Sequence, residues 1–275
     1  MITLNHFVRR NPQVSIQDFR EYWLNTHAEQ ARCLMASMGV GRYIKCETLH
    51  DDEVNILLQT MYGTAKDSYD FVDQMIIGDL ASFKEALVSP DVQEQLKALH
   101  AQTSKMLDNS RSDYWFSIDV PQLFPRHEVK ATWQNTHLKT FYVPRRLPHL
   151  GLEETQLHWN SCHGGMARQF AQFLPYDKYV QGHRIESSVI NQFKALLGDD
   201  FENESSIIGQ AEAWLDRRTV PSLQGPEVDR MMAMLVQDIA LVVDSATSHI
   251  FVAKEHTVFE KAVIKEPIPL LLNAD

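Results

Sequence analysis

Two tryptophan–histidine pairs are the residues of this chain best suited to chemistry. Trp23 and His27 are four residues apart, and so are Trp159 and His163. A spacing of four places two side chains one turn apart on the same helix face. Histidine titrates near neutral pH and can take up or release a proton. We therefore predict His27 and His163 as general acid–base residues, with Trp23 and Trp159 as aromatic walls of a binding site.

Residues near these pairs could hold a substrate. Arg9 and Arg145 each follow a segment of strand composition, where an arginine can clamp an anion or a carbonyl oxygen. Tyr43 and Tyr179 open the next predicted strand in each half, and each can donate a hydrogen bond. Each of these residues also has a structural interpretation. The histidines can be core residues whose ring nitrogens are hydrogen-bonded, the arginines can be solvent-exposed, and the tyrosines can simply pack in the core. The residues alone leave both interpretations open.

The two motifs belong to an internal repeat with an offset of 136 residues. Eight of the 35 positions from 9 to 43 are identical at that offset, whereas average composition gives about 2 by chance. The offset also relates three later pairs: Pro90 and Pro226, Asp108 and Asp244, and Ser112 and Ser248. We predict a first repeat over 1–120, a linker near 120–129, a second repeat over 129–256 and a C-terminal tail over 257–275.

Each repeat has the pattern strand, helix, strand, strand, helix, strand. Apolar residues recur every three or four positions from Ile16 to Met38, which predicts an amphipathic helix. The other helices are expected at 79–87, 90–107, 152–174 and 226–243, and the strands at 2–10, 42–49, 69–77, 113–119, 139–146, 178–185, 207–216 and 249–255. The segments 50–52 and 186–206 are expected to be polar surface connections. This order predicts an α+β chain of two ferredoxin-like βαββαβ repeats, packed sheet to sheet as an intramolecular dimer.

Composition excludes several classes of protein. The 275 residues carry 26 Lys and Arg against 36 Asp and Glu, for a net charge of −10. Such a chain repels nucleic acid and anionic membrane surfaces. No apolar run approaches the 18 residues of a membrane span, and no apolar leader follows the N-terminus. The three cysteines, Cys33, Cys46 and Cys162, form no metal or disulfide pattern. We predict a cytoplasmic protein.

Motifs for metals and nucleotides are not evident either. His158 and His163 are five residues apart and would fall on different faces of a regular helix, so we predict no metal site there. The sequence carries no nucleophile elbow, zinc-protease, phosphate-loop or dinucleotide motif. We therefore expect no nucleotide cofactor.

The segment RRNPQVSIQDFREYWLNTH resembles the EthD family of the dimeric α/β barrel superfamily. The carrying pattern is a basic pair, Pro, Ser at the helix cap, Phe, Tyr-Trp and His. The second copy, RRLPHLGLEETQLHWNSCH, departs from it at Gly151 and Thr155. The segment EAWLD (212–216) and the turn at Pro226 also look EthD-like. The resemblance extends over two tandem copies to about residue 256.

The resemblance implies an intramolecular dimeric α/β barrel, with a ligand cleft in each repeat between the helices and the sheet. Relatives degrade ethers and aromatics, isomerise lactones or tailor aromatic polyketides, and more distant ones are cofactor-free monooxygenases or bind haem. The expected function is an enzyme of the isomerase, dehydratase, decarboxylase or oxygenase type, acting on a small apolar carbonyl or aromatic compound. The alternatives are a haem or small-ligand binding protein and a protein whose histidines are structural. A further homodimer of whole chains stays open.

Overall fold

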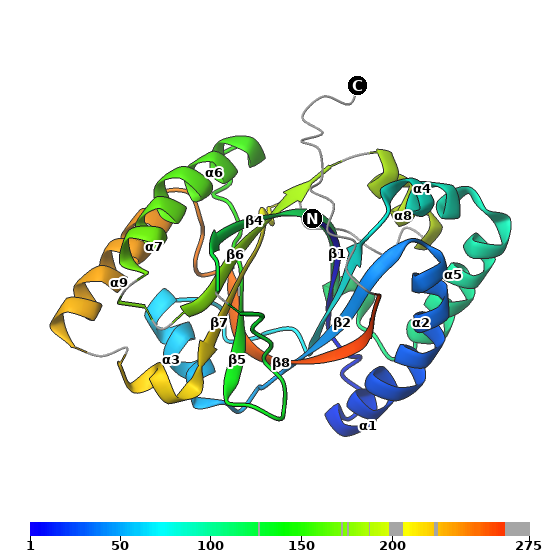
Figure 1. Ribbon diagram of the computed structural model, residues 1–275, viewed down its shortest axis with the longest axis horizontal. Coiled ribbons are helices and arrows are strands. Elements are labelled where there is room, and N and C mark those ends of the chain that lie inside the picture. The colour runs from blue at the N-terminus through cyan, green and yellow to red at the C-terminus, as the bar shows by residue number, and fades with distance from the viewer. Residues whose placement is uncertain are drawn as a thin grey trace.

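Eight strands form a closed barrel, with helices on two opposite sides of it (Figure 1). The computed structural model describes residues 1–125, 127–171, 173–174, 176–186, 188–197, 206–222 and 225–261. The strands are β1 (Ile2–Val8), β2 (Val40–Thr48), β3 (Phe71–Ile77), β4 (Asp113–Leu123), β5 (His137–Val143), β6 (Tyr176–Ile185), β7 (Gly209–Asp216) and β8 (His249–Glu260).

Each half of the chain supplies one four-stranded sheet. The order around the barrel is β1-β3-β2-β8-β5-β7-β6-β4, so the N-terminal half contributes β4-β1-β3-β2 and the C-terminal half contributes β8-β5-β7-β6. Both follow the ferredoxin-like order, and every pairing is antiparallel. The sheets join through β2–β8 and β4–β6. The predicted fold of two ferredoxin-like repeats in one barrel is confirmed, and closure leaves neither sheet with an open edge.

The helices cover the outer faces of the two sheets. In the N-terminal half they are α1 (Ile16–Glu21), a π-helical segment (Tyr22–His27), α2 (Ala28–Ser37), α3 (Glu53–Tyr62), α4 (Leu80–Val88) and α5 (Pro90–Thr103). In the C-terminal half they are α6 (Leu152–His158), a π-helical segment (Trp159–His163), α7 (Gly164–Phe170), α8 (Ser188–Leu197) and α9 (Pro226–Ile239). Short 3₁₀ turns occupy Asn109–Arg111 and Arg217–Ser222. The predicted helix over 16–38 is present, and the Ser15 side chain caps it by accepting from the Asp18 N–H.

One pair of residues related by the 136-residue offset makes the same contact in both halves. The Arg9 N–H donates to Ser112 Oγ at 2.9 Å, and the Arg145 N–H donates to Ser248 Oγ at 3.0 Å. Both bonds tie the end of a first strand to the start of a fourth. The offset therefore relates equivalent positions of the two sheets.

Two helices lie over the opposite half of the barrel from the half that encodes them. In Figure 1, α3 lies beside α7 and α9, whereas α8 lies beside α4 and α5. Val54 and Leu58 of α3 pack in the core of the C-terminal half, and Phe193 and Leu197 of α8 pack in that of the N-terminal half. The expectation of a polar connection over 186–206 is wrong for 188–197, because an apolar face of α8 is buried; residues 198–205 lie outside the described residues.

The barrel interior is filled by side chains. Aromatic rings occupy one end, where Phe7 stacks on Trp115 with centroids 4.3 Å apart. Farther along, Lys139 lies 2.8 Å from Glu212 and 3.4 Å from Glu255. The side chains inside are therefore held by packing and by ion pairs.

The predicted domain limits remain a prediction. β4 continues to Leu123 and β8 to Glu260, so the expected limits at 120 and 256 fall within strands. Most of the predicted tail, from residue 262, lies outside the described residues. Within the described part of the chain, no helix has the length and apolar character needed to cross a membrane.

Candidate functional site

A π-helical segment carries the tryptophan–histidine pair in both halves. Such segments widen the helix by one residue per turn and are common at functional sites. In the N-terminal half, Trp23 and His27 stack with ring centroids 4.0 Å apart and planes 5° apart. The predicted placement of the two rings on one helix face is therefore observed. Trp159 instead stacks on His183, with centroids 4.9 Å apart.

A buried set of charged groups lies behind His27. Lys45 Nζ on β2 lies 2.9 Å from His27 Nδ1 and 2.7 Å from Asp73 Oδ2 on β3. Asp73 also accepts a hydrogen bond of 2.8 Å from the Trp23 indole and one of 2.5 Å from the Tyr43 hydroxyl. Lys45 Nζ lies 4.1 Å from the centroid of the Trp23 ring, within cation–π range. Lys45 and Asp73 are 0% and 1% exposed, so this ion pair is desolvated.

Burial sets the protonation states of this set. It lowers the pKa of His27 well below its usual value, with the Lys45 charge adding to the effect. It also lowers the pKa of Lys45 to about 8, although Asp73 opposes the shift. Burial and the Asp73 carboxylate raise the pKa of Tyr43 well above its usual value. At neutral pH, His27 is therefore a neutral imidazole. Its Nδ1 accepts from the Lys45 ammonium, and its Nε2 carries the proton.

A small cavity of about 50 Å³ adjoins the Trp23–His27 stack. Apolar side chains from α2, α5 and α8 enclose it, together with His6, Tyr43, Asp73 and Tyr114 from the sheet. His6 stacks on Tyr114 with centroids 3.7 Å apart. A space of this size holds a few water molecules, so a larger ligand requires the surrounding side chains to move.

The C-terminal half keeps the aromatic pair but not the charges. Strand register places Gln181 where the N-terminal half has Lys45, and Ala211 where it has Asp73. Gln181 donates from Nε2 to the Trp159 carbonyl at 3.1 Å and to the Tyr179 hydroxyl at 3.2 Å. A second cavity of about 50 Å³ adjoins His163 and Tyr179.

A carboxylate replaces the ammonium as the partner of the second histidine. His163 Nδ1 lies 3.2 Å from Asp238 Oδ2 of α9, and His158 Nε2 lies 3.0 Å from the other oxygen. Burial alone would raise the pKa of Asp238, but the two histidines lower it. The expectation that residues five apart face different directions is wrong here, because a π-helix brings positions i and i+5 to one face. Asp238 accepts, so His163 Nδ1 carries a proton.

The two arginines expected near the histidines lie elsewhere. Arg9 is 7% exposed, pairs with Asp67 at 2.7 Å and lies 4.6 Å from the centroid of the Tyr69 ring. The charges of Arg9 and Arg145 both act on Asp113, whose pKa burial raises. The two arginines therefore approach one barrel end and do not line the cavity beside His27.

Lys45 and Asp73 are the functional candidates that sequence reasoning missed. Both are charged residues within the strand segments YIKCE and FVDQM, where apolar residues stand two positions before each of them. Alternation puts Lys45 on the same face as Tyr43, and Asp73 on the same face as Phe71 and Met75. A charged residue on the helix-facing side of a predicted strand was the feature of the sequence that could have identified them. As for metals, no cluster of three or more candidate ligands occurs among the residues described.

Comparison with solved structures supports the fold. The chain is similar to an anthrone oxidase-like protein, with a TM-score of 0.56 and 10% identity over 96% of both chains. A protein named as a candidate monooxygenase from Lactobacillus acidophilus NCFM has a TM-score of 0.45 and 7% identity, over 96% of this chain and 98% of that one. A protein named as a candidate chlorite dismutase has a TM-score of 0.43 and 10% identity, over 94% and 95%.

Comparison of sequences gives a family for one half. A search of curated proteins found no significant match. The family model of the EthD domain matches residues 11–109, a range that contains Trp23, His27, Lys45 and Asp73. The family model therefore identifies an EthD-like segment within the N-terminal half of the barrel, over residues 11–109.

Proposed function

We propose that the N-terminal half is the working site of an enzyme that moves a proton on a small apolar carbonyl or aromatic compound without a nucleotide cofactor. The observation that carries this proposal is the buried Lys45–His27–Asp73 set beside a cavity. Burying an ion pair is costly, and a structural core would be as stable with apolar side chains of similar volume. Perturbed buried groups that adjoin a cavity are characteristic of sites that perform chemistry.

His27 is the proton-transfer group of this proposal. With Lys45 charged, the Nε2–H of His27 donates to a substrate oxygen on which negative charge develops, and Lys45 restores the proton through Nδ1. With Lys45 neutral, His27 acts as the base: its Nε2 takes a proton from the substrate, and its Nδ1–H passes a proton to Lys45. Because the pKa of Lys45 is about 8, both forms are accessible near neutral pH. Trp23 forms the aromatic wall, and Tyr43 and Trp23 hold Asp73 in place.

Aromatic ketones are the substrates to test first. The likeness to an anthrone oxidase-like protein supports that choice of class. Anthrone and dioxygen give anthraquinone and water. The step requires a base to remove a ring CH₂ proton, after which dioxygen adds to the carbanion and water is lost. A tricyclic substrate exceeds this cavity of about 50 Å³, so α5 and α8 would have to move outward as it binds.

Haem fits this site poorly. A porphyrin is far larger than about 50 Å³, and the Nδ1 atom of His27 is held by Lys45. We therefore assign no step to haem.

The test compares equivalent histidines. Anthrone, aromatic ketones and lactones would be screened by dioxygen uptake and absorbance, with His27→Asn and His163→Asn as matched variants. His27→Asn should lower turnover by about 10²–10⁴, and His163→Asn should leave it within a few-fold. Unchanged turnover in His27→Asn would remove the assignment.

Binding without catalysis is the second candidate, favoured by the small size of the cavity. It predicts a ligand that changes Trp23 fluorescence, requires His27 for affinity and is recovered unchanged.

A further inference from the structure

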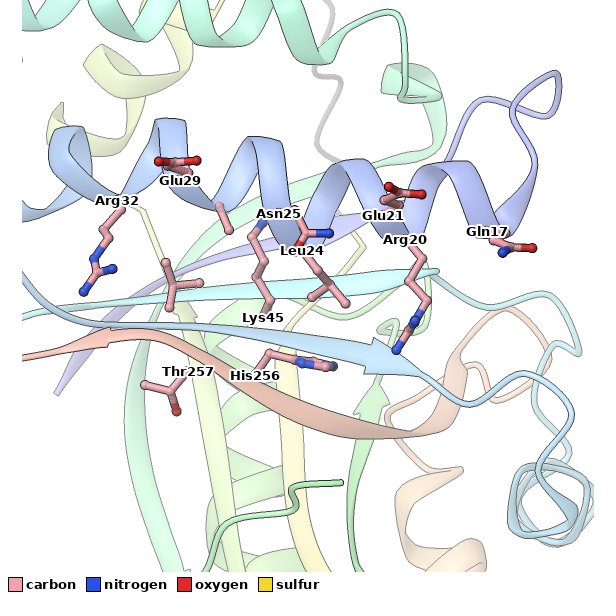
Figure 2. A pocket seen from close by; sticks show the side chains of 12 residues that line it. Gln17, Arg20, Glu21, Leu24, Asn25, Glu29, Arg32, Lys45, His256 and Thr257 are labelled. Carbon is pink, nitrogen blue, oxygen red and sulfur yellow. The ribbon is translucent and has the colours of Figure 1, made fainter. Parts of the chain in front are cut away.

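An open groove runs along the other side of the α1–α2 helix from the His27 cavity. Its volume is about 860 Å³, within the range of small-molecule sites. The helix forms one wall, and Lys45 of β2 and His256–Val258 of β8 form the other (Figure 2). The groove therefore follows the seam where the two sheets join.

Cationic side chains reach into this groove from the helix. In Figure 2, Arg20 and Arg32 extend toward the strands, whereas Glu21 and Glu29 stay on the helix side. Arg20 is paired with Glu47. Arg32 is exposed and makes no ion pair within the described residues. In a chain of net charge −10, an unpaired guanidinium in a concave site favours an anion.

Three apolar side chains line the groove between these arginines, among mostly polar ones. Leu24 and Val258 are half-buried and Ala28 is buried, and all three line it. Arg20 and Arg32 are twelve residues apart, which corresponds to about 18 Å of helix. A ligand held at Arg32 would therefore lay an apolar body over Leu24, Ala28 and Val258.

The equivalent position in the C-terminal half is filled by the protein itself. Gln122 stands where the N-terminal half has Val258, and its Nε2 donates to Asn160 at 3.1 Å and to Gln181 at 3.3 Å. Its Oε1 accepts from Arg168, the counterpart of Arg32.

Gly164 leaves room for the Gln122 side chain, which with Asn160 we call the plug of the C-terminal half. A Cβ at Gly164 would lie 2.8 Å from Gln122 Oε1, and the counterpart of Gly164 is Ala28. The same arginine is thus satisfied internally in one half and left to solvent in the other.

We propose that the Arg32 groove binds an organic acid with an apolar body, its carboxylate on Arg32 and its body along Leu24, Ala28 and Val258. The groove shares Lys45 with the charged set behind His27 but no lining residue with the His27 cavity, and neither proposal depends on the other.

The test is calorimetric titration of the full chain with 2-naphthoate, and with 2-naphthamide as the uncharged analogue. We expect one naphthoate per chain, weaker binding of the amide and affinity that falls with added salt. Arg32→Gln should weaken naphthoate binding about tenfold or more, as loss of a charged hydrogen bond implies. Arg168→Gln is the matched control and should leave affinity unchanged.

A second variant transfers the plug. Leu24→Asn, Ala28→Gly and Val258→Gln together copy the C-terminal half and should abolish binding while the circular dichroism spectrum stays native. His27→Asn should bind naphthoate normally. Equal affinity for acid and amide, wild-type affinity in Arg32→Gln or in the folded plugged variant, or loss of binding in His27→Asn would each overturn the proposal.

Discussion

Lys45 and Gln181 occupy equivalent positions on β2 and β6, and each contacts the tryptophan–histidine segment of its own half. The first is charged and faces Asp73; the second is neutral and lies in register with Ala211. The two halves thus show one scaffold with and without a buried ion pair. This provides a control within the same chain for what the charges contribute.

A double-mutant cycle should reveal strong coupling between the two charges. Asp73→Ala leaves Lys45 buried without its carboxylate and should cost about 3–5 kcal/mol of unfolding free energy. Lys45→Gln with Asp73→Ala copies the C-terminal pair and should be more stable than Asp73→Ala alone. Urea unfolding measures Asp73→Ala, Lys45→Gln and the double variant. Additive losses would mean that the charges do not interact.

The two motif histidines should be opposite tautomers. Lys45 donates to His27 Nδ1, so the proton is expected on Nε2, whereas Asp238 accepts from His163, so the proton is expected on Nδ1. Long-range ¹H–¹⁵N correlation spectra distinguish the two forms, with His27→Asn and His163→Asn to assign the signals. The same tautomer in both would contradict the assigned partners.

Turnover of a substrate that takes its proton from His27 should fall as the pH rises through about 8. Anthrone, from which His27 would remove a proton, requires neutral Lys45 and should show the opposite trend. Below that value Lys45 is charged and holds the Nε2–H form of His27; above it the ammonium is lost, and with it the donor to Nδ1. For a substrate that takes its proton from His27, a profile of kcat/KM against pH should therefore bend downward near 8 in the wild type. The Lys45→Gln variant should lack this bend, and its persistence there would assign it to another group.

A substitution on α8 should destabilise the N-terminal core. The Phe193 ring is 3% exposed and lies 5.9 Å from that of Phe116, so Phe193→Ala should cost about 3–5 kcal/mol. Asn191→Ala, on the exposed face of the same helix, should change stability by less than about 0.5 kcal/mol. Equal effects of the two would mean that α8 does not pack as described.

The sequence predicted the elements whose partners are local or repeated. The helix over 16–38 has a full apolar stripe, and the offset aligned Arg9 with Arg145, whose backbone N–H groups make equivalent hydrogen bonds in the structure. The helices at 53–62 and 188–197 were missed, although Val54 and Leu58 have helical spacing. Each helix is short and is next to a polar segment of the sequence. Its apolar face is explained only by elements far away in the sequence, β8 for α3 and Phe116 of β4 for α8.

The chemistry was harder to predict than the fold. Lys45 and Asp73 meet because β2 and β3 pair in one register, and a single sequence does not reveal that register. The π-helical segments also altered which residues share a face, which is why His158 and His163 meet at Asp238. Arg9 was predicted from its motif, but strand geometry directs it to the barrel end.

The exchange of α3 and α8 sets how the two halves can be recombined. A chimera that joins the first half of one relative to the second half of another would separate each cavity from the helix that encloses it. The workable exchange moves 53–62 with the C-terminal barrel strands and 188–197 with the N-terminal ones. Across relatives, positions on α8 should therefore covary with α4, α5 and β4 rather than with their sequence neighbours. Each half therefore depends on a helix that the other half encodes, so we expect substitutions in the two halves to be coupled.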